Sequence, residues 1–123
     1  MKKEYEKNLN EEQKKVMIEK GTEPPGTGKL LYNKKKGVYK CAACGNVLFK
    51  SEHKFESGSG WPSFYDVAGK KSVKLKRDAD GVRIEVACAN CGAHLGHLFN
   101  DAFQTPTGKR YCMNSVALDF KEN

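Results

Sequence analysis

No long apolar run occurs in this 123-residue sequence. A membrane-spanning helix needs about 20 predominantly apolar residues, and a secretory leader needs an apolar stretch behind its basic start. Neither follows the lysines and glutamates of residues 1–8. We therefore expect a cytoplasmic protein that makes no contact with a membrane.

The sequence also lacks low-complexity tracts and any repeat longer than a paired cysteine motif, which argues against a repeat array. Hydrophobic residues make up 38% of the chain and charged residues 30%, proportions typical of a globular protein. We predict a single domain over residues 1–123, with a helical segment at 1–21 and a β domain at 22–120. We expect it to be a monomer.

Acidic residues are too few to balance the basic ones, and the net charge is +7. The lysine runs at 34–36 and 70–71 stand among glutamates and turn residues and form no evident stripe. A basic stripe is the electrostatic signature of nucleic-acid binding. We therefore interpret the charge as a solvated surface and expect no specific nucleic-acid partner.

The five cysteines are an odd number, which does not suit a complete disulfide framework. Four of them form two pairs, Cys41 with Cys44 and Cys88 with Cys91, and a glycine follows each pair. Two thiolates one tight turn apart are typical of a zinc knuckle, and two knuckles supply the ligands of a closed structural site. We predict one structural Zn²⁺ per chain. A pair of redox-active Cys-x-x-Cys motifs is the alternative.

Residues 10–21 carry the signals of a short helix. Asn10 can cap the first turn, Gln13 can complete a capping box, and Gly21 stands where a C-terminal stop is expected. The prolines within residues 22–26 then favour extended or turning backbone.

Short strands are predicted from Val38 onward. Residues 72–87 are expected to form an antiparallel hairpin around the turn residues 78–81. Apolar and charged residues alternate in it, so one set should face the core and the other water. The set expected in the core is Val73, Leu75, Val82, Ile84 and Val86, and the set expected in water is Arg83 and Glu85. The fold class is therefore a mainly antiparallel β domain preceded by one or two short helices.

If four cysteines bind zinc, Cys112 is the only free thiol. A strand over residues 110–116 would place Arg110, Cys112, Asn114 and Val116 on one face. Arg110 would then favour the thiolate, the reactive form of cysteine, and Asn114 could bind a polar substrate. An inert cysteine packed in the sheet is the alternative.

His94 and His97 follow Cys91 too closely to complete a Cys2His2 finger. With zinc bound by sulfur, both are free for proton transfer. Trp61 is the only tryptophan, and the glycines and proline around it indicate a loop. Its indole offers a surface for a methyl group or a thioether, and a core anchor is the alternative.

Three motifs follow one another along the chain: Gly60-Trp61-Pro62-Ser63-Phe64, His94-Leu95-Gly96-His97-Leu98-Phe99 and Arg110-Tyr111-Cys112-Met113-Asn114-Ser115. Together with the two knuckles they resemble the methionine-R-sulfoxide reductases, the MsrB family, over about Thr22 to Phe120. The resemblance implies two small antiparallel sheets with short N-terminal helices, stapled by a four-cysteine zinc site. It also implies a shallow, solvent-open active site.

The resemblance implies that Cys112 attacks the sulfoxide sulfur and that His94 protonates the departing oxygen. His97 and Asn114 would position the polar end of the substrate. The products would be methionine and a sulfenic acid, which thioredoxin or another external dithiol would reduce. The residues implied to contact the substrate are Trp61, whose indole would hold the terminal methyl, Phe99 and Arg110.

The sequence departs from the family pattern in two places. Many family members carry a second, resolving cysteine where this chain has Ser59. No thiol outside the knuckles can then form a disulfide with Cys112, so we expect an external dithiol to act directly on the sulfenic acid. The second departure is Asp101-Ala102-Phe103, where the family more often has Asp-Gly-Pro.

Two other classes of function are consistent with the knuckles. A zinc-ribbon module that binds nucleic acid would use the basic charge, but it leaves Cys112 and the histidines without a role. A small chaperone-like or exchange-factor domain could share the zinc-stapled sheet without any nucleophile. In that case, replacing Cys112 with serine would leave binding intact.

Overall fold

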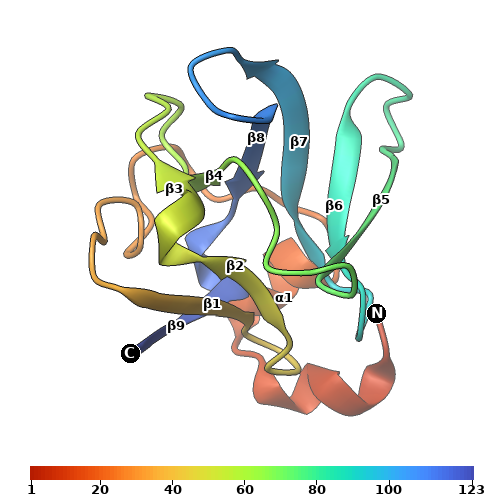
Figure 1. Ribbon diagram of the computed structural model, residues 1–123. Coiled ribbons are helices and arrows are strands. Elements are labelled where there is room, and N and C mark those ends of the chain that lie inside the picture. The colour runs from red at the N-terminus through yellow and green to blue at the C-terminus, as the bar shows by residue number, and fades with distance from the viewer.

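Two antiparallel sheets contain all the strands in the computed structural model, which describes residues 1–123 (Figure 1). The smaller sheet has three strands in the order β2-β1-β9, and the larger has six in the order β3-β4-β8-β7-β6-β5. The helical elements are η1 (Lys3–Asn8), α1 (Glu11–Met17), η2 (Ser51–His53) and η3 (Ser115–Ala117). The strands are β1 (Gly37–Cys41), β2 (Val47–Lys50), β3 (Lys54–Phe55), β4 (Ser63–Phe64), β5 (Val73–Arg77), β6 (Ile84–Cys88), β7 (His94–Ala102), β8 (Gly108–Met113) and β9 (Leu118–Glu122). The predicted fold class is confirmed.

Aromatic side chains from both sheets meet in the core. Phe49 of β2 stacks on Phe64 of β4 with ring centroids 4.4 Å apart, and Tyr39 of β1 meets Phe64 edge-on at 4.9 Å. Tyr111 of β8 lies 5.7 Å from Phe49. Because these rings belong to different sheets, their burial fixes one sheet against the other.

The N-terminal helix begins where the sequence predicts and ends earlier. The Asn10 side chain accepts from Gln13 N–H, and the Gln13 side chain accepts from Asn10 N–H, so the capping box is present. The helix stops at Met17, before Gly21, because Lys20 adopts a left-handed φ of 61° and the Gly21 N–H turns back to the Lys15 carbonyl. No helix in the structure combines the length and apolar character that a membrane span requires.

The predicted hairpin forms, but the prediction of which side chains face the core and which face water was partly wrong. β5 and β6 pair antiparallel from Val73 with Cys88 to Arg77 with Ile84. Val82 lies in the turn and is 82% exposed, and Leu75 is also exposed, whereas Glu85 is only 1% exposed. β6 lies between β5 and β7, and its charged residue faces a buried histidine instead of water.

The predicted strand at 110–116 ends at Met113. Arg110 and Cys112 share a face, as expected, and the Arg110 guanidinium contacts the Cys112 sulfur. Asn114 lies in the turn after β8, and Val116 belongs to η3, so the common face does not extend to either. The backbone after β8 instead places Asn114 beside Glu23, which follows the N-terminal helix.

Candidate active site and metal centre

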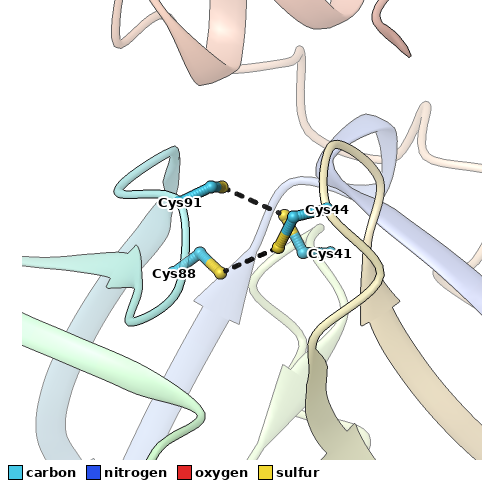
Figure 2. A group of neighbouring side chains, drawn as sticks. All are labelled: Cys41, Cys44, Cys88 and Cys91. Carbon is cyan, nitrogen blue, oxygen red and sulfur yellow. Dashed lines mark hydrogen bonds between the residues drawn. The ribbon is translucent and has the colours of Figure 1, made fainter. Parts of the chain in front are cut away.

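The four paired cysteines converge on one point between the two sheets (Figure 2). Their sulfur atoms all lie within 4.8 Å of one another. Cys41 Sγ is 3.7 Å from Cys91 Sγ, and Cys44 Sγ is 3.6 Å from Cys88 Sγ. The gathering of both pairs in one cluster favours a single four-thiolate metal site over two separate redox motifs.

Each pair lies on a knuckle that ends in a glycine. In the first knuckle, Gly45 N–H donates to the Cys41 carbonyl, and Gly45 has a φ of 80°. In the second, Gly92 N–H donates to the Cys88 carbonyl, and Gly92 has a φ of 82°. This left-handed backbone is where glycine is favoured. Because the first knuckle follows β1 and the second follows β6, a bound ion would join the small sheet to the large one.

The crowding of the four thiols also favours a cation among them. Burial raises the pKa of the Cys91 thiol, whereas the neighbouring Cys41 thiol lowers the pKa of Cys88. Clustered, buried thiols therefore do not all ionise together unless a positive charge lies among them. Asn46 Nδ2 also approaches Cys88 Sγ at 3.7 Å, as an outer hydrogen-bond donor would.

The remaining cysteine, Cys112, lies at the centre of a polar cluster. Its side chain is on β8, which lies between β4 and β7, and the residue is 7% exposed. Ser63 Oγ is 3.4 Å from Cys112 Sγ, and Ser59 Oγ is 3.5 Å from it. Ser57 Oγ hydrogen-bonds both serines, at 2.8 Å to Ser59 and 2.7 Å to Ser63. Two hydroxyl groups therefore contact the sulfur, and a third hydroxyl holds both of them.

Arg110 provides a positive charge at the same sulfur. Its NH1 group donates to Cys112 Sγ at 2.9 Å. Nε and NH2 both donate to the Asp101 carboxylate at 2.9 Å, and the guanidinium lies 4.4 Å from the Phe99 ring centroid. The bond with Asp101 raises the pKa of Arg110 and lowers that of Asp101. Asp101 and the Phe99 ring thus hold the guanidinium in place, and its remaining NH1 group can stabilise a thiolate at Cys112.

A small pocket opens beside Cys112. Its volume is about 70 Å³. Its walls combine an indole, a phenyl ring, an imidazole and the thiol, and they consist of Thr22, Trp61, Arg83, Gly96, His97, Phe99, Cys112 and Asn114. A wider groove of about 660 Å³ elsewhere on the chain is lined by neither cysteine nor histidine. The smaller pocket is therefore the candidate active site, because a thiol and an imidazole meet in its walls.

His94 and His97 lie on one face of β7 despite their spacing. Residues three apart on a regular strand point to opposite faces. The register between β6 and β7 shifts at Val86/Ala87, so a β-bulge inserts one extra residue on β7. The two rings consequently lie 5.3 Å apart. The sequence placed both histidines near the thiol but gave no sign of the bulge that aligns them.

Each histidine has a carboxylate partner from the β5–β6 hairpin. His97 Nε2 is 2.6 Å from Asp78 Oδ2, and the same carboxylate oxygen lies 3.4 Å from Arg83 NH2. The hydrogen bond with His97 lowers the pKa of Asp78. A carboxylate partner of this kind fixes the orientation of the ring. Of the two histidines, only His97 lines the pocket.

His94 lies behind His97 and is 2% exposed. Its Nδ1 is 2.6 Å from Glu85 Oε2. Burial lowers the pKa of His94. Burial alone would raise the pKa of Glu85. The hydrogen bond to His94 and the positive charges of His94, Lys20 and Lys76 outweigh that effect, so the pKa of Glu85 is lowered. The neutral ring therefore donates from Nδ1 to an ionised carboxylate, and its Nε2 is a buried nitrogen without a partner.

The amide of Asn114 is already hydrogen-bonded within the protein. Its Oδ1 accepts from Glu23 N–H at 2.9 Å, and its Nδ2 donates to the Leu95 carbonyl at 3.0 Å. Trp61 is half-buried in its loop, and its Nε1 donates to the Glu23 carbonyl at 3.0 Å. Both residues form pocket walls with their polar groups directed into the structure.

Several residues of the site were missed from sequence. The sequence identifies Asp78 only as a turn residue and predicts that the Glu85 side chain faces solvent. The serines at positions 57 and 63 were not singled out. Glu85 carried one usable signal: it is the only charged residue within residues 84–89, and a glutamate in such a stretch is a candidate for a buried partner of histidine.

Comparison with known proteins identifies close relatives. The SelR domain matches residues 9–122. The peptide methionine sulfoxide reductase MsrB of Methanosarcina barkeri is 59% identical over 120 residues, which cover 96% of this chain and 84% of that protein. The MsrB of Leifsonia xyli is 55% identical over 96% of this chain and 86% of that protein, and the MsrB of Escherichia coli K12 is 51% identical over 97% and 88%.

The crystal structure of the Mis18 'Yippee-like' domain has a similar fold. It superposes with a TM-score of 0.53 over 72% of this chain and 98% of that chain, at 18% identity, and so shows a shared fold alone. The MsrB relatives, in contrast, match almost the whole chain, and they establish it as an enzyme that reduces methionine sulfoxide. The chain therefore belongs to the SelR domain family, the family of the peptide methionine sulfoxide reductases named MsrB.

Proposed function

We propose that the chain reduces the R epimer of methionine sulfoxide in proteins or peptides, with Cys112 as the nucleophile. The observation that carries this proposal is the surroundings of Cys112 Sγ. The sulfur accepts from the Arg110 guanidinium at 2.9 Å and borders a pocket that also contains His97 and Trp61. A thiolate beside a fixed cation and a proton donor is equipped to attack an electrophilic sulfur.

In the proposed reaction, the Cys112 thiolate attacks the sulfoxide sulfur and the sulfur–oxygen bond of the substrate breaks. As the oxygen gains a proton and leaves as hydroxide, a bond forms between Cys112 Sγ and the substrate sulfur. Hydroxide then attacks Cys112 Sγ, the sulfur–sulfur bond breaks, and Cys112 is left as a sulfenic acid. The substrate sulfur is reduced to the thioether of methionine, and the Cys112 sulfur is oxidised by the same two electrons. When the Cys112 thiolate becomes an uncharged sulfenic acid, Arg110 loses an anionic partner, but its bond to Asp101 keeps it in position.

The proton comes from the histidine side of the pocket in this proposal. The family resemblance assigns the donation to His94 and positioning to His97. His97 lines the pocket and is oriented by Asp78, whereas His94 is buried, neutral and bonded to Glu85. We propose that His97 faces the departing oxygen and that His94, with its ring 5.3 Å away, supports His97 from behind.

Epimer selection would follow from separate sites for the methyl group and the oxygen. Trp61 and Phe99 provide apolar walls in a pocket of about 70 Å³, and His97 provides the polar one. If the methyl group occupies the indole side, only one epimer directs its oxygen toward His97 while exposing its sulfur to Cys112. Asn114 would act in this arrangement by holding the pocket wall through its bonds to Glu23 and Leu95.

An external dithiol such as thioredoxin would complete the cycle. The polar groups in contact with Cys112 Sγ belong to Arg110, Ser63 and Ser59, and the other four cysteines lie in the metal cluster. One thiol would form a mixed disulfide with Cys112 as water leaves, and a second thiol would release it. We propose that the four-cysteine cluster binds one structural Zn²⁺, and that the chain works as a single, cytoplasmic, monomeric domain.

Trapping the oxidised enzyme tests this proposal. One equivalent of an R-sulfoxide peptide, added without reductant, should yield about one equivalent of methionine, and a dimedone-type reagent should then label Cys112. Mass spectrometry of peptides from the labelled protein measures the site and the stoichiometry. A disulfide between Cys112 and a knuckle cysteine, or methionine formation without oxidation of Cys112, would contradict it.

A further inference from the structure

Residues 22–28, here called the Glu23 segment, cross from the N-terminal helix to the loop that carries Trp61. Thr22 at its start lines the pocket. Gly26 N–H donates to the Gly60 carbonyl at 2.8 Å. Gly60 has a φ of 95°, and a side chain there would meet Pro25 Cβ at 2.7 Å. The Glu23 segment is therefore in direct contact with the tryptophan loop.

The backbone of Glu23 holds two walls of the pocket at once. Its N–H donates to Asn114 Oδ1 at 2.9 Å, and its carbonyl accepts from Trp61 Nε1 at 3.0 Å. These are the only hydrogen bonds of the Trp61 side chain and of the Asn114 Oδ1 atom. The positions of the indole and of the amide therefore depend on the position of residue 23.

The side chain of Glu23 fixes that position. The residue is 5% exposed, and its Oε1 accepts from Val116 N–H at 3.2 Å, in η3 just after β8. Its Oε2 is buried without a hydrogen-bond partner. A side chain at Gly28 would collide with this oxygen and with Ser115 Oγ, so the segment packs closely around the carboxyl group. Burying a carboxyl group is costly, and here it anchors a segment that has no regular secondary structure of its own.

We propose that Glu23 is a positioning residue for the substrate pocket. Its carboxyl group fastens the Glu23 segment to the turn after the catalytic strand, and its backbone then holds Trp61 and Asn114 at the distance that the substrate requires. The inference rests on the proposed function in one respect, namely that this pocket binds the sulfoxide. The geometric part, that the Glu23 carboxyl group sets the environment of Trp61, is independent of any substrate.

Glu23→Ala and Glu23→Gln separate this role from a purely structural one. Alanine removes the acceptor for Val116 N–H, whereas the amide oxygen of glutamine retains it. Because Trp61 is the only tryptophan, its fluorescence reports the loop directly. In the alanine variant, quenching by acrylamide should increase and KM for an R-sulfoxide peptide should rise about tenfold, with a smaller change in kcat. The glutamine variant should match the wild type in both measurements.

Val16→Ala is the matched control for a general loss of stability. Val16 is buried in the core on α1 and does not line the pocket, so its truncation should lower the melting temperature without changing Trp61 quenching or KM. If Glu23→Ala does not fold, Glu23→Asp replaces it, since the shorter side chain withdraws the carboxylate from Val116.

Three results would overturn the inference: unchanged quenching and KM in the alanine variant, equal changes in Val16→Ala, or a glutamine variant that behaves like alanine. Quenching is measured without substrate. A wild-type protein that fails to reduce sulfoxide would therefore contradict the proposed function, while the role of Glu23 would still be decided.

Discussion

Cys112→Ser is expected to lower kcat/KM for methionine sulfoxide by a factor on the order of a thousand or more. The serine hydroxyl is protonated at neutral pH and is a weak nucleophile toward sulfur, and no second thiol lies near the pocket to replace it. The fold and the metal content should be unchanged, because Cys112 is not part of the four-cysteine cluster. Steady-state assays with dithiothreitol, together with circular dichroism and zinc analysis, measure all three properties.

Ser63→Ala is the matched control for Cys112→Ser. Ser63 Oγ lies 3.4 Å from the same sulfur, but Ser63 is not the proposed nucleophile. Its removal deletes the contact with the sulfur and the hydrogen bonds to Ser57 and the Trp61 carbonyl, but it leaves the thiol in place and should reduce the rate far less than loss of the thiol. Comparable losses in the two variants would show that the polar surroundings, and not the thiol, carry the reaction.

Cys88→Ser, or removal of the metal with a strong chelator, is expected to unfold the chain or to loosen it severely. Metal binding at four-thiolate sites contributes on the order of 10 kcal/mol in small zinc peptides, which is comparable to the whole stability of a domain. In this chain the site joins the knuckle after β1 to the knuckle after β6, so its loss frees the two sheets from each other. Thermal unfolding monitored by circular dichroism measures the effect.

Cys112→Ser is also the control for this experiment, because it removes a thiol without removing a ligand. It should retain one zinc per chain and a melting temperature close to that of the wild type. A chelated protein that keeps its melting temperature and its activity would contradict a structural role for the metal.

The parts of the site that depend on local spacing could be predicted from sequence. The knuckles follow from two cysteines and a glycine within five residues, and Arg110 reaches Cys112 because residues two apart share a strand face. The antiparallel hairpin followed from alternation and turn residues in the same way. Each of these features is set within a few neighbouring positions.

The parts that depend on pairing between distant strands could not be predicted. Alternation assigned Glu85 to water because it cannot show that β6 is flanked by β5 and β7. The bulge that places His94 and His97 on one face arises from the register with β6, which no local pattern reveals. Glu23 acts through hydrogen bonds to residues 38 and 91 positions away in the sequence, and nothing in its own neighbourhood indicates them.

The measurement that tests the central claim most directly is the reduction of separately prepared R and S methionine sulfoxide peptides by the purified chain with dithiothreitol. In the proposed mechanism Cys112 attacks within a pocket that has distinct sites for the methyl group and the oxygen, so we expect turnover of the R epimer alone, absent in Cys112→Ser. Equal turnover of both epimers, turnover of the S epimer alone, or R turnover that survives in Cys112→Ser would contradict it.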